Sequence, residues 1–313
     1  MLILPMEIKR TALLPNLLTI ANGVCGYHAL VRLGKISVGP DGNLLHGENF
    51  TIAAYLVLLG MIFDVFDGKL ARTFGGGSEL GAQLDSLCDL VTFGLVPAVM
   101  ILRMNLEPAS GGSALDAGGV GPWQKVVWFL ALAYFLGALL RLARFNVENA
   151  PDESAHLAFK GLPSPAAAGC VASLVIFQRY ILKFDANELQ WIERWLSPSL
   201  RQTISDQIAP GIKYVLAFLA PVLGFAMVSD RIRFAHMGST LLGRRQSFDF
   251  LVYLIFGVLF LFMVPEIVLP LAFFGYLAWP PMVIASKWIG SRLGRAPREE
   301  SAQGTEESEP ERP

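Results

Sequence analysis

Four aspartates in this sequence have the residue type and the spacing that metal chemistry needs. Asp64 and Asp67 end one apolar segment, and Asp85 and Asp89 open the next one. Residues three or four positions apart share one face of a helix, so two neighbouring antiparallel helices would aim the four carboxylates at one point. Carboxylates that converge in a low dielectric stay ionised only when cations compensate them. Since all-oxygen ligands favour Mg2+, Mn2+ or Ca2+ over zinc, we predict a site for divalent metal ions.

The residues around the aspartates indicate what such a metal site would bind. Two metal ions can clamp a diphosphate and stabilise negative charge on its attacking and leaving oxygens. Gly68 would let a ligand approach the backbone closely, and Arg72 could neutralise a phosphate. A proton or cation pathway is the alternative use of acids inside membrane segments. That alternative has no obvious need for the Gly, Ala and Arg residues interleaved with the aspartates.

The aspartates belong to long apolar segments, which decide the fold class. Hydrophobic residues make up 53% of the 313 residues and charged residues 16%, against about 25% charged residues in soluble domains. Eight segments are long enough, or nearly so, to cross about 30 Å of hydrocarbon as helices. Continuous apolar runs without alternation favour helices over a barrel. We therefore predict an all-α integral membrane protein with spans at 13–31, 51–68, 84–102, 124–142, 165–184, 212–229, 249–264 and 267–288.

The positions of lysine and arginine predict the orientation of these spans, because cytoplasmic loops carry an excess of both residues. In the eight-span arrangement, 16 of the 25 basic residues fall on the side that holds both termini and 9 fall on the other side. Both termini and the aspartate site are thus predicted on the cytoplasmic side of the cytoplasmic (inner) membrane. The net charge of −1 gives no general case for nucleic-acid binding, which needs a clustered basic surface.

The spans divide the chain into four regions. Residues 1–184 form the predicted transmembrane core, which carries the aspartates, and residues 212–292 add further membrane helices. Residues 185–211 mix charged, aromatic and aliphatic side chains, a pattern typical of an interfacial amphipathic helix or an external connector. Residues 293–313 are rich in Glu, Ser, Pro and Arg. Such a segment has little to bury, so we predict a disordered cytoplasmic tail.

The spacing of the aspartates and their neighbours resembles the motif of the CDP-alcohol phosphatidyltransferase family. The resemblance implies a helical membrane enzyme, usually a homodimer, that displaces CMP from a CDP-linked lipid with an alcohol. It implies that Asp64, Asp67 and Asp85 bind Mg2+ or Mn2+, in two sites, and that Asp89 lies near them and deprotonates the acceptor hydroxyl. The CDP-lipid would contact Gly68, Ala71, Arg72 and Gly81. All eight motif positions are present, in the order Asp64-x2-Asp67-Gly68-x2-Ala71-Arg72-x8-Gly81-x3-Asp85-x3-Asp89.

Three further stretches resemble the bacterial and archaeal phosphatidylserine synthase branch of this family. They lie within residues 14–26, 141–146 and 161–169. This resemblance implies that CDP-diacylglycerol and L-serine react to give phosphatidylserine and CMP. A sister transferase that uses glycerol 3-phosphate or inositol phosphate is the alternative within the family. A secondary transporter is an alternative from another class, but the second half of the chain shows no evident repeat of the aspartate-rich segment.

Candidate residues for the two substrates lie at the cytoplasmic ends of the predicted spans. Serine brings a carboxylate, which arginine can bind bidentately, so Arg141, Arg144 and Lys160 are candidate serine ligands. The alternative is that these three residues only anchor helices at the membrane surface. Asn16 and Thr19 lie one helical turn apart and could donate hydrogen bonds to the nucleotide, or they could cap a helix.

Overall fold

The computed structural model describes residues 13–38, 44–45, 47–73, 79–105, 121–148, 159–182, 197–230, 233–234 and 248–293. Each of the eight predicted apolar segments corresponds to a helix or to a chain of helices, so the all-α class is confirmed. The helices in the first half are α1 (Leu13–Gly34), α2 (Glu48–Thr73), α3 (Glu79–Asp89), the π-helical segment η2 (Leu90–Leu95), α4 (Val96–Met104) and α5 (Pro122–Glu148). They are followed by α6 (Ser164–Leu182), α7 (Pro198–Thr203), π-helical η4 (Ile204–Ile208), α8 (Ala209–Val228), α10 (Phe248–Met263) and α11 (Pro265–Leu293).

Six of these helical stretches are long and apolar enough to cross a membrane, which makes this a multi-pass membrane protein. α1 and α10 are not among the six. α10 has only 16 residues, and α1 carries several polar side chains along its length. The count of eight spans therefore stays a prediction. The six spans within the described residues are Glu48–Leu70, Leu80–Met104, Pro122–Val147, Ser164–Leu182, Asp206–Val228 and Pro265–Val283.

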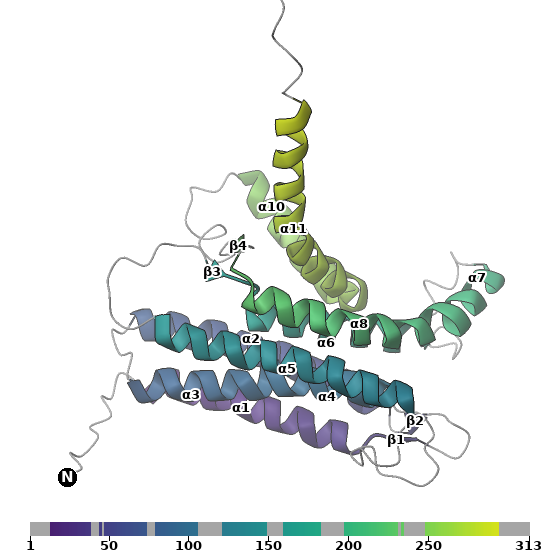
Figure 1. The fold of residues 1–313 in the computed structure, drawn as a ribbon, viewed down its shortest axis with the longest axis horizontal. Helices are drawn as coiled ribbons and strands as arrows, with labels where there is room; N and C mark the ends of the chain where they lie inside the picture. Colours follow the sequence, from purple (N-terminus) through teal and green to yellow (C-terminus); the bar gives the residue numbers. More distant parts are fainter. Residues whose placement is uncertain are drawn as a thin grey trace, which may run out of the picture.

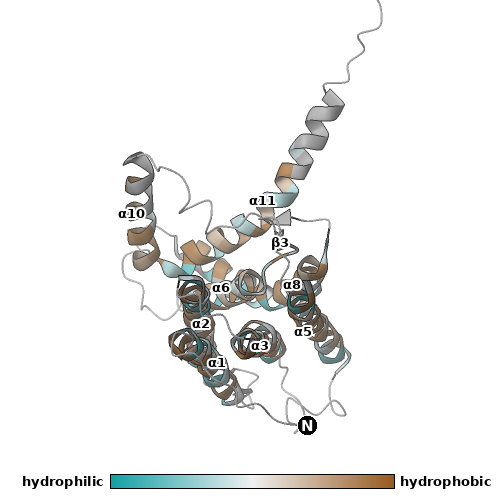
Figure 2. Ribbon diagram, turned by 90° about the vertical axis from the view of Figure 1, so that its left-hand side faces the viewer, coloured by the Kyte–Doolittle hydropathy of each residue, from teal (hydrophilic) through white to brown (hydrophobic). Residues whose placement is uncertain are grey.

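The helices form one bundle from which the last two diverge (Figure 1). α1 to α6 and α8 run side by side, whereas α11 crosses α6 and extends away from the bundle. α10 leaves the bundle in a different direction from α11 (Figure 2). Seen along the helix axes, α1, α3 and α5 lie below α2, α6 and α8 (Figure 2). The buried core is built mainly from small and aliphatic side chains of α1, α2, α5, α6 and α8, together with η2 and α4. Phe273 of α11 contacts the backbone of Gly169, which seats α11 on α6.

Two short antiparallel strand pairs connect the helix ends. β1 (Ser37–Val38) pairs with β2 (Leu44–Leu45). β3 (Phe159–Lys160) pairs with β4 (Arg233–Phe234), and this second pair joins the segment before α6 to the segment after α8. The sequence does not predict either pair, because each forms between strands of only two residues.

The predicted connector at 185–211 is partly described by the structure. Residues 185–196 lie outside the described residues, as does the predicted tail from residue 294 onward. From Pro198 the chain is helical and runs through η4 into α8, and the candidate span begins at Asp206. Ile204 and Ala209 pack against the core, which explains why this helix begins before the predicted residue 212.

Close contact between α5 and α8 depends on two glycines. A Cβ atom at Gly137 would lie 2.6 Å from both the Cα and the carbonyl oxygen of Gly224, and a Cβ atom at Gly224 would lie 2.7 Å from the carbonyl oxygen of Ala133. These neighbours are backbone atoms, which cannot move aside as a flexible side chain can. The two helices can therefore approach this closely only without side chains at the crossing.

Gly137→Ala is expected to destabilise the protein by about 1–3 kcal/mol, the usual cost of forcing extra atoms into a packed site. The measurement is thermal unfolding of the purified protein in detergent. Gly211→Ala is the matched control, because a Cβ atom at Gly211 on α8 would meet no atom within 4 Å. Equal melting temperatures for the two variants would contradict the proposed crossing.

Candidate active site

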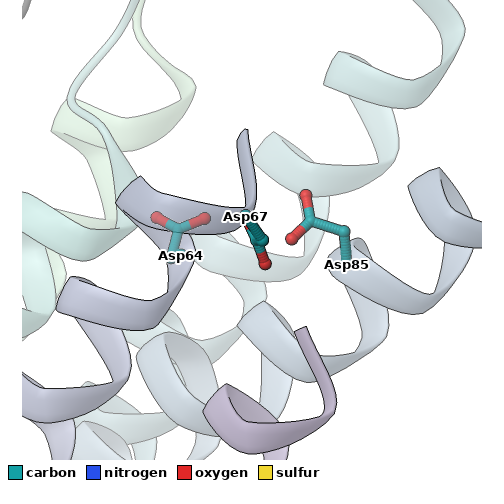
Figure 3. A group of neighbouring side chains, drawn as sticks. All are labelled: Asp64, Asp67 and Asp85. Carbon is teal, nitrogen blue, oxygen red and sulfur yellow. The ribbon is translucent and has the colours of Figure 1, made fainter. Parts of the chain in front are cut away.

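Three of the four predicted aspartates lie close together, on α2 and α3 (Figure 3). Asp64 and Asp67 project from the C-terminal part of α2, and Asp85 projects from α3. One carboxylate oxygen from each residue lies within 4.8 Å of the other two. Asp67 is buried, and Asp64 and Asp85 are half-buried. We call these three residues the carboxylate cluster.

The carboxylate cluster fits a divalent metal ion. Its ligand atoms are all carboxylate oxygens, which suit hard cations such as Mg2+ and Mn2+. Oδ1 of Asp85 is buried and has no hydrogen-bond partner among the described residues, although a buried polar atom normally has one. A bound cation would satisfy this oxygen and offset the mutual repulsion of the three carboxylates.

Asp89 lies one helical turn beyond Asp85 and belongs to a neighbouring hydrogen-bonded group rather than to the carboxylate cluster. Its Oδ1 accepts a hydrogen bond of 2.9 Å from Nδ2 of Asn22 on α1. The side chain is buried, and its charge interacts with those of Asp64, Asp67 and Asp85. The fourth aspartate is therefore next to the cluster and held by an amide.

Asn22 is itself fixed by the packing of α1, α2 and η2. Thr92 donates a hydrogen bond of 3.0 Å from its hydroxyl to the carbonyl oxygen of Asn22. Gly26 and Gly60 make this possible, because a Cβ atom would lie 2.4 Å from Oγ1 of Thr92 at Gly26 and 2.8 Å from Oδ1 of Asn22 at Gly60. Thr92 belongs to the π-helical segment that begins directly after Asp89. Such segments are often found at functional sites.

The structure describes the side chains of only some of the residues that are predicted to contact the CDP-lipid. The Thr19 hydroxyl is buried and donates to Oδ2 of Asp67 at 2.8 Å, so it supports the carboxylate cluster directly. Asn16 is half-buried on α1 and Gly81 is half-buried on α3. Gly68 faces open space, since a Cβ atom there would meet no atom within 4 Å. Ala71 and Arg72 belong to α2, but their side chains lie outside what the structure describes.

The three predicted serine ligands are separated in the structure. Arg141 faces the site: its Nη1 donates to the Ser164 hydroxyl at 2.7 Å, and its charge interacts with those of Asp64 and Asp89. Arg144 forms an ion pair with Asp230, directly after α8. Lys160 pairs through its backbone with Arg233 in the β3–β4 ladder, and its side chain lies outside the described part of the chain.

Sequence reasoning missed several residues that the structure places around the site. Asn22 had a detectable signal, because it is a polar residue one turn after Thr19 within a predicted membrane span. Asp230 stands at the end of a predicted span, where an acid is ordinary, so nothing distinguished it. Tyr276 of α11 is packed against the core and interacts electrostatically with Arg141, which no sequence pattern indicated.

The fold and the site together define a multi-pass membrane protein with a carboxylate cluster suited to a divalent metal ion. A model of the CDP-alcohol phosphatidyltransferase family matches residues 12–200, which contain the whole carboxylate cluster. The chain belongs to this family.

Several curated proteins are similar to the same part of the chain. The CDP-diacylglycerol--serine O-phosphatidyltransferase of Saccharomyces cerevisiae is 31% identical over 185 residues, which are 57% of this chain and 59% of that protein. The protein of the same name from Bacillus subtilis is 32% identical over 161 residues, covering 51% of this chain and 74% of that protein. That of Methanocaldococcus jannaschii is 35% identical over 113 residues, covering 36% of this chain and 45% of that protein.

Proposed function

We propose that this protein transfers the phosphatidyl group of CDP-diacylglycerol to the hydroxyl group of L-serine, giving phosphatidylserine and CMP. The observation that carries the proposal is the carboxylate cluster of Asp64, Asp67 and Asp85 with Arg141 beside it. This arrangement combines ligands for a metal that binds diphosphate with a cation that can bind a carboxylate. The names of the similar proteins from yeast and Bacillus subtilis support serine as the acceptor.

In this proposal, the oxygen of the serine hydroxyl forms a bond to the phosphorus of the phosphatidyl group, and the bond from that phosphorus to CMP breaks. Asp89 accepts the hydroxyl proton, and Asn22 fixes its carboxylate through the 2.9 Å hydrogen bond. The carboxylate cluster would hold divalent metal ions, and we expect two ions of Mg2+ or Mn2+. When bound, these ions neutralise charge on the diphosphate. Gly68 leaves room beside the cluster for the CDP group.

The described helices also support a proposed location for the reaction. The carboxylate cluster, Arg141 and Ser164 lie at the same end of the bundle. The excess of basic residues on that side predicts that this end faces the cytoplasm. We therefore propose that the site and both termini face the cytoplasm at the inner membrane, where a water-soluble acceptor is available. A homodimer is part of the same proposal and rests on the family resemblance.

The test of the proposal is CMP release by the purified protein in detergent, with CDP-diacylglycerol and Mn2+ or Mg2+. Serine, glycerol 3-phosphate, inositol phosphate and choline are supplied in parallel. We expect release that depends on serine. Release with another acceptor alone would overturn the choice of serine and keep the metal site. If no acceptor supported release, the transporter hypothesis would gain support.

Arg141→Ala is expected to raise the KM for serine at least about tenfold, because a hydrogen bond to a charged group contributes about 1.5–3 kcal/mol. The KM for CDP-diacylglycerol should change much less. Arg141→Lys keeps the charge without the planar guanidinium, so we expect a partial recovery. An equal rise in both KM values would instead show that Arg141 supports the structure of the whole site.

A further inference from the structure

The ion pair between Arg144 and Asp230 joins a residue inside the region shared with the family to a residue outside it. Arg144 lies within the matched residues 12–200, and Asp230 lies beyond them. Nη1 of Arg144 contacts Oδ1 of Asp230, and the two side chains are 31% and 65% exposed. Both charges can therefore be reached from water, as a site for a soluble acceptor requires.

Three structural features around Asp230 hold the end of α8 against the end of the bundle that carries the carboxylate cluster. The backbone N–H of Leu162 donates to the carbonyl oxygen of Ala226 at 2.9 Å. Gly161 has a φ of 82°, and a Cβ atom there would lie 2.3 Å from the carbonyl oxygen of Met227. The β3–β4 ladder closes the same junction on the other side of Asp230. The end of α8 is thus tied to the turn that begins α6.

The same turn leads into the active site. Ser164 begins α6 and accepts a hydrogen bond of 2.7 Å from Arg141. Arg144 follows Arg141 by three positions on α5, so the two arginines lie on the same side of that helix. An ion pair joins Asp230 to Arg144, and a hydrogen bond joins Arg141 to Ser164. Arg141 also interacts electrostatically with Asp89.

A guanidinium group beside a carboxylate is complementary to the zwitterion of an α-amino acid. Arg144 can bind the carboxylate of such an acceptor together with Arg141, and Asp230 can accept hydrogen bonds from its ammonium group. The Arg144–Asp230 pair has no net charge, and neither has the zwitterion. Glycerol 3-phosphate and inositol phosphate have no cationic group for Asp230, so its carboxylate would repel them.

We propose that Arg144 and Asp230 form the subsite for the charged groups of the amino-acid acceptor, with Asp230 binding the ammonium group and selecting against purely anionic acceptors. This inference rests on the proposed function, because it specifies how the serine acceptor is recognised. It gives the end of α8 a role in acceptor choice. The simpler role, in which Asp230 only anchors Arg144 and α8, makes a different experimental prediction.

The test uses the full-length protein in detergent with CDP-diacylglycerol and Mn2+. Asp230→Asn keeps the size of the side chain and an oxygen for Arg144, but it removes the charge that would bind an ammonium group. Two quantities are measured: the KM for serine and the inhibition constant of 3-hydroxypropionate against serine. 3-Hydroxypropionate has the hydroxyl and carboxylate of serine and no amino group.

We expect Asp230→Asn to raise the KM for serine about tenfold or more. The inhibition constant of 3-hydroxypropionate should stay within about twofold or fall, and the KM for CDP-diacylglycerol should not change. Equal weakening of serine and 3-hydroxypropionate would overturn the proposal in favour of an anchoring role. An unchanged KM for serine would overturn it as well.

Two controls separate this inference from the function on which it rests. Asp206→Asn removes an exposed aspartate near the opposite end of the same helical stretch, so its kinetics should match those of the unmodified protein. Serine-dependent CMP release by the unmodified protein tests the proposed function alone. If that release occurs and Asp230→Asn behaves like Asp206→Asn, only the subsite is wrong.

Discussion

Asp85→Asn is expected to lower kcat/KM for CMP release by at least about a thousandfold. A catalytic metal ion contributes several kcal/mol of charge stabilisation, and each 1.36 kcal/mol corresponds to a factor of ten in rate. The substitution removes one of the three charges that would hold the metal. It also replaces the carboxylate whose Oδ1 is buried without a hydrogen-bond partner among the described residues. The side chain keeps its size, so the packing of α3 should be preserved.

Metal binding can be followed without the reaction. A ligand that binds only the folded protein raises its melting temperature, so Mn2+ should stabilise the unmodified protein and should stabilise Asp85→Asn much less. Gln83→Ala changes an exposed residue of the same helix and should respond to Mn2+ as the unmodified protein does. Normal stabilisation of Asp85→Asn by Mn2+ would remove Asp85 from the metal site.

The sequence predicted the helices well because apolar length is a property of each segment alone. The region at 84–102 shows where such prediction ends. The single span predicted there is confirmed as Leu80–Met104, but the sequence does not predict that this span is built from α3, the π-helical segment η2 and α4. The Thr92–Asn22 hydrogen bond that accompanies η2 joins it to α1. A contact between helices distant in sequence cannot be inferred from the residues of one helix.

The aspartate spacing predicted the carboxylate cluster for the same local reason. Helical periodicity places Asp64 and Asp67 on one face of their helix, and Asp85 and Asp89 on one face of theirs. It does not predict which of these residues lie at the same level when the two helices pack together. The structure brings Asp64, Asp67 and Asp85 together and gives Asp89 an amide partner from α1. That partner depends on the close packing at Gly60 and Gly26, which only the assembled bundle defines.

The arginines show a similar limit. Arg141 and Arg144 occupy equivalent places in the sequence pattern, so both were candidate serine ligands. In the structure, Ser164 binds Arg141 and Asp230 binds Arg144. Asp230 reaches α5 because α8 is tied to the turn before α6, and that tie requires the positive φ of Gly161. A single glycine in a left-handed conformation is common in turns, so its consequence for Arg144 was not visible in the sequence.

Asp89→Asn is expected to lower kcat by about 10²- to 10⁴-fold, the usual contribution of a general base. The asparagine cannot accept the hydroxyl proton of the acceptor. Its amide oxygen can still accept the hydrogen bond from Nδ2 of Asn22, so the variant should fold. Because Asp89 lies next to the carboxylate cluster but is not one of its three aspartates, the KM for CDP-diacylglycerol and the stabilisation by Mn2+ should change little. The measurements are steady-state CMP release and thermal unfolding with and without Mn2+.

Asn22→Ala separates the chemical role of Asp89 from its positioning. This variant leaves the Asp89 carboxylate in place and removes the 2.9 Å hydrogen bond that orients it, so we expect a smaller loss of kcat, about tenfold. A larger loss for Asn22→Ala than for Asp89→Asn would indicate that the amide, rather than the carboxylate, contacts the substrate. Loss of Mn2+ stabilisation in Asp89→Asn would make Asp89 a metal ligand, and near-normal kcat would remove it from the base role. Together the two variants therefore decide whether Asp89 acts as the base, helps to hold the metal, or does neither.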